Sequence, residues 1–329
     1  MSRPRATRHF FRFSLRLLLI LTVIAGCVLA PIANRARRQR IAVAEVVRLK
    51  GGVLYDLGSH HGPKSPWYVT LMGFDVWADV IGVDLEGAHV NDLSPLRSFK
   101  KLSELHLDET AVTDLGPLQE LTCLKKLYIE HAPVSDLSPL ASLTNLEKLK
   151  IWSAPVTDLS PFKDLTALKE LDISDAPVSD LSPLADLTSL KELLLTDTQV
   201  NDLSVLRGLK NLGCLVVRNS PVHDLSPLRG LRGLYQLNVS GTNVSDLSAL
   251  GDLTALDTLV ASNTRIKDLS PLKEMRKLRE LYVSHTDVFD LSPLRGLPFL
   301  VDLQAVGTPV TDEEAESLRK AVPRCIIER

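Results

Sequence analysis

A motif of seven residues, VSDLSPL at Val134, recurs with small changes at a strict spacing of 22 residues along most of this chain. Between successive copies lies a second pattern, such as LKKLYI from Leu124. Self-similarity at a period of about 20–50 residues is the signature of stacked-repeat proteins. The chain is therefore predicted to fold as one elongated array of coils and not as two average domains. The motif begins at eleven positions: Val90, Val112, Val134, Val156, Val178, Val200, Val222, Val244, Ile266, Val288 and Val310.

The joint consensus, LxxLxLxx(T/A)xVxDLSPLxxL, predicts two sides for each coil. The LxL alternation predicts a short strand with one buried face, whereas SPLxxLxxL has helical spacing and predicts the return segment. VIGVDL from Val80 keeps the same register ahead of the first motif. Aromatic residues make up only 5% of the chain, and an interior of Leu, Val and Ile suits coils that stack in identical layers.

These in-register copies resemble the leucine-rich repeat family, and among its classes the 22-residue form of the bacterial internalins. The resemblance covers roughly residues 80–329. It implies an α/β solenoid, a right-handed coil with a parallel β-sheet on the concave face and short 3-10 or helical segments on the convex face.

The chain departs from the internalin pattern at the position where such repeats usually carry Asn. Thr and Ser at this position can still donate and accept hydrogen bonds, but Ala cannot. The backbone groups near Ala132, Ala154 and Ala176 must then be satisfied in another way, helped by the proline that follows each of them and lacks a donor. We expect the fold to survive this change. The column consists of Ala88, Thr110, Ala132, Ala154, Ala176, Thr198, Ser220, Thr242, Thr264, Thr286 and Thr308.

An aspartate stands at the same place in every coil, which argues for a structural turn, since a catalytic group is needed only once. The Asp can accept the N–H of the residue two positions on, and the Ser-Pro pair that usually follows suits an N-cap and first helical position. Calcium needs six to eight oxygens, and one Asp per coil falls short. We predict no metal site for the column, which consists of Asp92, Asp114, Asp136, Asp158, Asp180, Asp202, Asp224, Asp246, Asp268, Asp290 and Asp312.

A binding surface must differ between coils, and the outward strand positions beside the LxL residues do differ. They mix aromatic rings and charges in the first half of the array, as interface hot spots do. The alternative is that an isolated exposed aromatic residue means little. The predicted partner-binding residues of the concave face are His106, Tyr128, Lys150, Trp152, Asp172, Arg218 and Tyr282.

Two functions fit this surface. The first is binding of a protein partner; the second is binding of a carbohydrate or cell-envelope polymer by Tyr128, Trp152 and the file of Ser240, Ser262 and Ser284. The sequence lacks GxSxG, HExxH, GxxxxGK[ST] and a GxGxxG in a strand-to-helix context, so we predict no catalytic residue, no enzyme activity and no cofactor.

Residues 17–33, LLLILTVIAGCVLAPIA, form an apolar run without a charge. A helix of this length rises about 25 Å, close to the thickness of a hydrocarbon core, so we predict a single-pass membrane anchor. Two alternatives remain open. A cleaved signal would use the small residue Ala30, which is followed by Pro31. The tetrapeptide that ends at Cys27, IAGC, looks like a bacterial lipobox, although the apolar run continues beyond it.

Charge is distributed unevenly along the chain. Residues 1–44 hold nine Arg and no acid, and because the whole chain carries −2, the remainder carries −11. An acidic body does not suit phosphate backbones, so we predict no nucleic-acid partner. Arginines flank both ends of the apolar run, so the positive-inside rule favours neither orientation clearly. The commoner arrangement places the large repeat domain outside the cytoplasm.

The predicted organisation has five parts. A helix with a Gly C-cap follows Ile41 and ends at Gly51, and the aromatic residues Trp67, Tyr68, Phe74 and Trp77 are expected to cover the open end of the first coil. At the other end, residues 313–321 are predicted to be an amphipathic helix, followed by a last strand that buries Cys325. The anchor followed by repeats is similar to a group of anchored repeat proteins in planctomycete bacteria. The parts are a basic arm (1–16), the anchor (17–33), a juxtamembrane segment with the N-terminal cap (34–79), the repeats (80–310) and the C-terminal cap (311–329).

Overall fold

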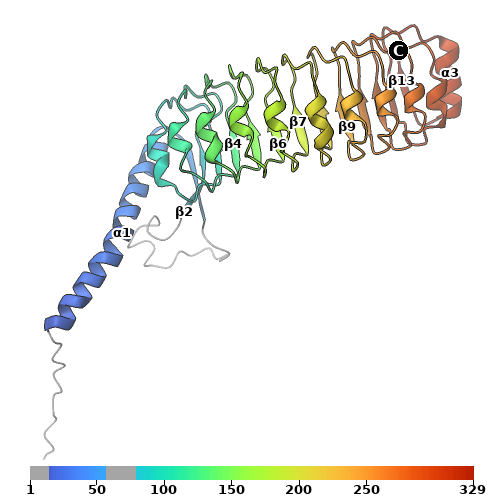
Figure 1. Cartoon of the computed structure of the whole chain (residues 1–329). Coiled ribbons are helices and arrows are strands. Elements are labelled where there is room, and N and C mark those ends of the chain that lie inside the picture. Colours follow the sequence, from blue (N-terminus) through green and yellow to red (C-terminus); the bar gives the residue numbers. More distant parts are fainter. Residues whose placement is uncertain (1–14, 57–78) are drawn as a thin grey trace, which may run out of the picture.

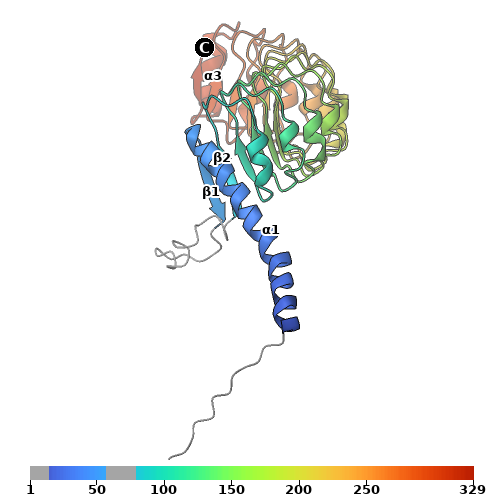
Figure 2. The ribbon, with the colours of Figure 1, turned by 90° about the vertical axis from the view of Figure 1, so that its left-hand side faces the viewer.

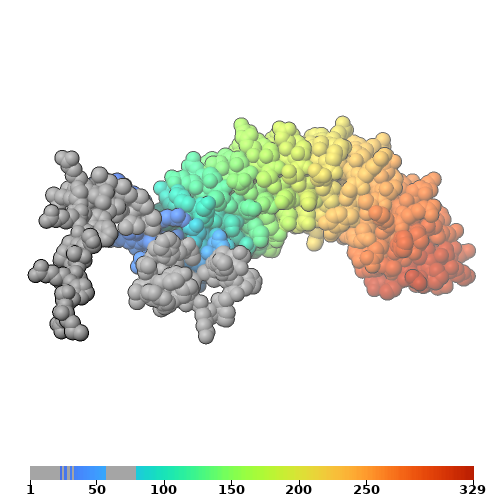
Figure 3. Space-filling model, turned by 90° about the horizontal axis from the view of Figure 1, so that it is seen from below, coloured from blue at the N-terminus to red at the C-terminus, as the bar shows by residue number. Residues whose placement is uncertain are grey.

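The computed structural model describes residues 15–56 and 79–329. Within this part the chain is an elongated, curved body of stacked coils (Figures 1 and 3). One helix, α1 (Leu15–Arg48), packs its second half on the first coil and projects away from the body at its other end (Figures 1 and 2). Inside α1, the undescribed side chains are those of residues 15–22, 24, 25, 28, 29 and 32.

A single 13-stranded sheet runs through the described coils, with its strands in sequence order. Strands β2 (Asp79–Asp84) to β13 (Ile326–Glu328) pair in parallel, and the register places equivalent residues of adjacent coils side by side, such as Leu105 and Leu127. The strand β1 (Gly52–Asp56) pairs with β2 in the antiparallel direction. The others are β3 (Glu104–His106), β4 (Lys126–Tyr128), β5 (Lys148–Lys150), β6 (Glu170–Asp172), β7 (Glu192–Leu194), β8 (Cys214–Val216), β9 (Gln236–Asn238), β10 (Thr258–Val260), β11 (Glu280–Tyr282) and β12 (Asp302–Gln304).

Short 3-10 helices return the chain on the other side of each coil (Figure 1). The predicted solenoid, with its sheet on the concave face and 3-10 segments on the convex face, is confirmed. The 3-10 helices are η2 (Ser94–Ser98), η3 (Gly116–Leu118), η4 (Ser138–Ser142), η5 (Ser160–Phe162), η6 (Ser182–Leu184), η7 (Ser204–Gly208), η8 (Ser226–Leu228), η9 (Ser248–Leu250), η10 (Ser270–Leu272) and η11 (Ser292–Gly296).

The core is one continuous column of aliphatic side chains. In the coil that begins at Leu105, the buried residues Leu105, Leu107, Val112, Leu115 and Leu118 are all 0 or 1% exposed. Burying one such side chain fully stabilises a fold by about 1.5–3 kcal/mol. Each coil shares its buried residues with two neighbours, so the stabilisation comes from stacking.

The aspartate column closes the turn before each 3-10 helix. From Asp92 to Asp290, each Oδ1 accepts the backbone N–H two residues on, at 2.7 or 2.8 Å. The following Ser is the first residue of the 3-10 helix and not its N-cap, a position that a Leu such as Leu137 occupies without a side-chain bond. Asp312 differs, because it begins a helix and forms an ion pair with Arg329.

The Thr/Ala column solves its hydrogen bonding in two ways. Each hydroxyl of the column donates to the backbone carbonyl three residues earlier, as Thr198 does to Leu195 at 2.9 Å. At Ala132 and Ala154 the chain makes a tighter turn, in which the backbone N–H two residues on bonds the carbonyl of the Ala, as Val134 does to Ala132 at 2.8 Å. Pro133 has no N–H to lose in this turn, so the sequence is consistent with it.

The first coil is covered by α1 and β1. Ala36, Ala42 and Val46 on one side of α1 are 2 or 3% exposed, and Gln39 between them is 3% exposed. The predicted separate helix after Ile41 is instead the end of one continuous helix, because residues 34–40 contain neither Gly nor Pro to interrupt it. The left-handed residue after the helix is Lys50 (φ 64°), not the predicted glycine.

Among the residues that the structure describes, no helix is both long enough and apolar enough to cross a membrane. The predicted anchor falls largely on residues of α1 whose side chains are outside the described set. Most of the predicted basic arm, and the aromatic residues Trp67, Tyr68, Phe74 and Trp77, also lie outside the described residues.

The last coil is covered by α3 (Asp312–Ala321), which packs on η11. Thr311 accepts the N–H of Glu314 at its start, while Ala315 and Leu318 face the core. β13 then continues the sheet. The prediction that Cys325 is a buried core residue is confirmed: it is 7% exposed, and burial raises the pKa of its thiol to about 11.

Candidate functional site

The register of the sheet brings five of the seven predicted binding residues together. His106, Tyr128, Lys150 and Asp172 end four adjacent strands and are register partners in that order, and Trp152 lies two residues after Lys150. Adjacent strands lie about 4.8 Å apart, so the four residues span only about 14 Å. We call His106, Tyr128, Lys150, Trp152 and Asp172 the concave patch.

His106 and Tyr128 form a stacked pair at one end of the concave patch. Their ring centroids are 4.3 Å apart with an interplanar angle of 10°. The imidazole lies between two carboxylates, with Nε2 3.3 Å from Glu104 and Nδ1 3.7 Å from Asp108. These contacts hold the two rings face to face, and both side chains are half-buried.

Trp152 is held in place two residues beyond the carboxyl end of β5. Its indole N–H donates to Oδ2 of Asp175 at 2.8 Å, and its ring lies 4.7 Å from that of His131 at 54°. Ser153 donates to the same Asp175 oxygen at 3.2 Å. Trp152 is 37% exposed, in line with its predicted outward orientation. Its neighbours also fix the position of the ring, which the sequence did not predict.

The partners of Trp152 come from a column that the sequence did not single out. Non-glycine residues of this column adopt the left-handed conformation, with φ between 54° and 57°. His131 and Asp175 occupy it one coil before and one coil after Ser153. The signal in the sequence is the repeated small or polar residue directly before the Thr/Ala column. The non-glycine members are Glu109, His131, Ser153, Asp175, Asp197, Asn219, Asn263 and His285.

A second missed column lies at the first residue of each strand and also faces the concave side. It begins with charges of both signs, in which Lys126 pairs with Glu104 at 3.3 Å and Lys148 pairs with Glu170. The bond to Glu170 raises the pKa of Lys148, so this lysine stays charged. In the sequence, this column lies two positions before the last residue of each strand. It places charged side chains beside the concave patch.

Two carboxylates beside the concave patch, Glu130 and Asp108, affect each other. Burial, followed by the nearby Asp108, raises the pKa of Glu130. The backbone N–H of Glu130 donates to Asp108 at 2.8 Å, so the two residues are tied coil to coil. At the far end, Ser174 donates to Oδ1 of Asp172 at 2.7 Å and orients that carboxylate.

The other two predicted binding residues lie outside the concave patch. Arg218 is exposed two coils beyond Asp172. Tyr282 is on β11, five strands from Asp172, and its hydroxyl donates to Asp302 at 3.0 Å. Burial, and then this bond, raise the pKa of Tyr282 to about 12. Neither residue shares a continuous surface of contacts with the five patch residues.

The serine file of the C-terminal half is less open than the sequence suggests. Ser240 is 7% exposed, and Ser284 accepts the N–H of Val306 at 3.2 Å. Within the described ranges, no group of three or more His, Cys, Asp and Glu side chains is placed to hold a metal ion. The arrangement on the concave face offers stacking, ion pairing and hydrogen bonding.

Comparisons with known proteins identify the architecture. No protein-family model and no curated protein matches the chain. Among solved structures, it is similar to an internalin of Listeria monocytogenes (inlF), with a TM-score of 0.68 and 26% identity over 79% of this chain and 85% of that one. A leucine-rich repeat protein of Leptospira interrogans has a TM-score of 0.69 and 22% identity over 72% of this chain and 62% of that protein, so the chain spans less than two thirds of its length.

A more distant similarity connects the fold to a receptor. The plant peptide hormone receptor RGFR1, solved in complex with RGF2, has a TM-score of 0.62 and 15% identity over 72% of this chain and 41% of the receptor. The proteins named here are described as internalins, leucine-rich repeat proteins or receptors, and none as an enzyme. Together with the regular strand and 3-10 pattern, these similarities give the chain a leucine-rich repeat solenoid of the internalin-like class.

Proposed function

We propose that this chain is a membrane-anchored, non-enzymatic interaction protein that binds a protein partner through the concave patch. The observation that carries the proposal is the arrangement of Trp152, whose ring is 37% exposed while its N–H is already bonded to Asp175. Immobilising a flexible side chain on binding costs about 0.5–1.5 kcal/mol. A ring that is fixed beforehand avoids most of this cost, which favours a role as an anchor in an interface.

The chemistry of the concave patch suits a polypeptide partner. The stacked His106–Tyr128 pair and the Trp152 ring provide aromatic area, while Lys150 and Asp172 provide one charge of each sign. Such a mixture matches the aromatic and charged side chains found at the centre of protein interfaces. The plant peptide hormone receptor RGFR1, which is similar in fold, was solved in complex with RGF2 and is in line with a polypeptide partner.

For the binding test, full-length chain carrying Trp152→Ala or Tyr128→Ala is compared with wild type in capture from envelope extract, followed by crosslinking and quantitative mass spectrometry. Truncating an interface hot spot costs about 2 kcal/mol or more, so retention of a specific protein should fall roughly 30-fold. Phe289→Ala is the matched control, because Phe289 is 58% exposed and lies outside the concave patch. Equal capture by all four proteins would show that the concave patch is not the site.

The same experiment addresses the second candidate, a carbohydrate or envelope polymer. Aromatic rings such as Tyr128 and Trp152 also stack on sugars, and Trp152 is 37% exposed. If the two alanine variants lose retention of labelled envelope glycan while their protein capture is unchanged, the glycan function replaces the protein function.

We further propose that residues 17–33 anchor the chain and that the repeats lie outside the cytoplasm. The support is the uncharged apolar run together with the projection of α1 away from the body (Figure 2). The anchor, the cap and the repeats would then form the order of parts expected from the sequence. A reporter active only outside the cytoplasm, fused after Arg329, should be active. Activity of a cytoplasmic reporter at the same place, or loss of the chain from membranes washed at high pH, would contradict the proposal.

A further inference from the structure

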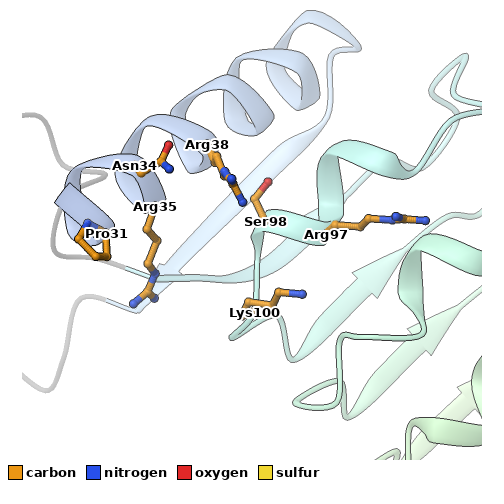
Figure 4. Close-up of a pocket in the computed structure, with 7 residues that line it drawn as sticks. All are labelled: Pro31, Asn34, Arg35, Arg38, Arg97, Ser98 and Lys100. Carbon is orange, nitrogen blue, oxygen red and sulfur yellow. The ribbon is translucent and has the colours of Figure 1, made fainter. Parts of the chain in front are cut away.

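A basic hollow lies between α1 and the first coil, away from the concave patch. It has a volume of about 310 Å³. Figure 4 shows Arg38 reaching from α1 toward Ser98 of η2, with Arg97 and Lys100 supplied by the first coil. The hollow exists because η2 packs against α1, which brings together residues that are about 60 positions apart in the sequence. Its lining consists of Pro31, Asn34, Arg35, Arg38, Arg97, Ser98 and Lys100.

The lining of the hollow is rich in positive charge. Four of its seven lining residues are cationic and none is acidic. Two of the cations are neutralised from outside, since Arg35 pairs with Asp79 and Lys100 pairs with Glu120 at 2.6 Å. Arg38 and Arg97 form no ion pair with any residue that the structure describes, and both are exposed. The Arg38 guanidinium is thus available to an anion, whereas Arg97 also helps to lower the pKa of the nearby Asp92 and Glu120 carboxyl groups.

The groups that line the hollow match a phosphate. Each guanidinium presents a fork of N–H donors whose geometry fits phosphate oxygens, and a charge-assisted bond of this kind is about twice as strong as a neutral one. Asn34 adds an amide, and Ser98 lies opposite Arg38 (Figure 4). Figure 4 shows the Arg97 side chain running away from Arg38, so Arg38 would contact the phosphate directly while Arg97 adds positive charge to the lining of the hollow.

The position of the hollow along α1 indicates where its phosphate comes from. If residues 17–33 span the hydrocarbon core, Arg35 and Arg38 lie roughly 3 and 8 Å beyond its edge at the helical rise of 1.5 Å per residue. The headgroup layer on each side of a bilayer is about 5–8 Å thick. We infer that this hollow binds a phosphate group, supplied by the headgroup of an anionic phospholipid. The source rests on the proposed anchoring, whereas the phosphate chemistry rests on the hollow alone.

The test is native mass spectrometry of the full chain purified in a neutral detergent with equal amounts of phosphatidylglycerol and phosphatidylcholine. Wild type should retain one phosphatidylglycerol that Arg38→Gln/Arg97→Gln loses, with the bound fraction falling roughly tenfold or more, because one charge-assisted bond and a second positive charge of the lining are removed. The matched control is Arg37→Gln/Arg40→Gln. It removes the same charge from exposed positions of the same helix that do not line the hollow, and it should retain the lipid.

The second arm replaces the lipids with millimolar inorganic phosphate. A phosphate adduct that depends on Arg38 and Arg97, without a preference for phosphatidylglycerol, would keep the anion site but overturn the lipid as its source. Equal lipid loss in the two double variants would overturn the hollow, because it would show a general effect of charge. If the chain stays in washed membranes while all variants bind lipid alike, this inference fails and the anchoring proposal stands.

Discussion

At the scale of single residues, Trp152 shows which structural properties follow from a position in the repeat and which do not. The period places it at the edge of the sheet on a column that varies, so its outward location follows from the sequence alone. Its contacts with His131 and Asp175 do not, because they depend on the left-handed turn of the coils on either side. Alternation predicts which face a side chain occupies, whereas its rotamer depends on neighbours that the pattern leaves free.

The left-handed column leads to a prediction for Glu109. This residue has φ 56°, is exposed, and belongs to a column in which Gly241 and Gly307 take the same conformation. The left-handed conformation costs a non-glycine residue about 1–2 kcal/mol. Glycine avoids this cost, but it loses more conformational entropy on folding, which offsets part of the gain. Glu109→Gly should raise the free energy of unfolding by about 0.5–1 kcal/mol in denaturant titration. Glu109→Ala keeps the strained backbone and should give no such gain; an equal gain would contradict the explanation.

The aspartate column leads to a second prediction at this scale. Asp180 accepts the N–H of Ser182 at 2.8 Å and the hydroxyl of Ser182 at 2.9 Å. Asp180→Ala leaves both donors without this partner and should lower the free energy of unfolding by about 1 kcal/mol. Asp180→Asn keeps an oxygen for the backbone N–H and should recover most of the loss. If alanine and asparagine behave alike, the Asx-turn is not what the column contributes.

At the scale of elements, the two ends of the array differ most from what the repeat predicts. The interior strands follow the period because each coil offers its neighbour the same surface. The end coils need another partner, and the sequence has no repeat to show which residues provide it. The C-terminal helix was predictable from its acidic first turn, but the N-terminal cover was assigned to aromatic residues outside the described part, whereas α1 and β1 cover the described first coil.

The fit of this N-terminal cover can be tested at Gly51. A Cβ added there would lie 2.6 Å from the carbonyl oxygen of Asp84 and 2.7 Å from Cδ2 of Leu85. Gly51→Ala should therefore push β1 off the first coil, lower its stability by about 1–3 kcal/mol, and speed hydrogen exchange in β1 and β2 first. At Gly52 the nearest atom is 3.6 Å away, so Gly52→Ala should leave exchange unchanged. Equal effects of the two changes would mean that close approach is not the reason for Gly51.

At the scale of the whole molecule, one period organises both scaffold and surface. The columns that vary least, Leu, Val and Asp, build the coil, and the predicted solenoid follows from them because similar layers can stack only in register. The varying columns show from the sequence which face carries the concave patch. They do not show where along the solenoid the patch begins and ends. Arg218 shares its column with Trp152, and Tyr282 shares its column with Tyr128, but both lie outside the patch because distance along the solenoid separates them.

Repetition also makes the pH dependence of stability a property of the whole array. Hydrogen bonds from the backbone and hydroxyl of the following Ser hold the pKa of six aspartates below the ordinary value of 3.8: Asp92, Asp136, Asp158, Asp202, Asp224 and Asp290. Each carboxylate binds a proton less readily in the folded chain than in the unfolded chain. Its contribution to stability is therefore complete above pH 3.8 and is lost as the pH falls through the lower folded-state pKa values.

The unfolding temperature of the full chain should thus fall progressively below about pH 3.8, with small shifts adding along the column. A variant with Asn at Asp136, Asp158, Asp202 and Asp224 keeps the backbone acceptor and removes four titrating groups. Its unfolding temperature, measured by circular dichroism between pH 5 and pH 2.5, should depend on pH less steeply than that of wild type. Parallel curves for the two proteins would show that acid acts elsewhere, on carboxylates such as Glu147, whose pKa is lowered by its bonds to Lys169 and Lys125. The comparison therefore tells whether the turn column or the ion pairs of the concave side limit the stability of the array in acid.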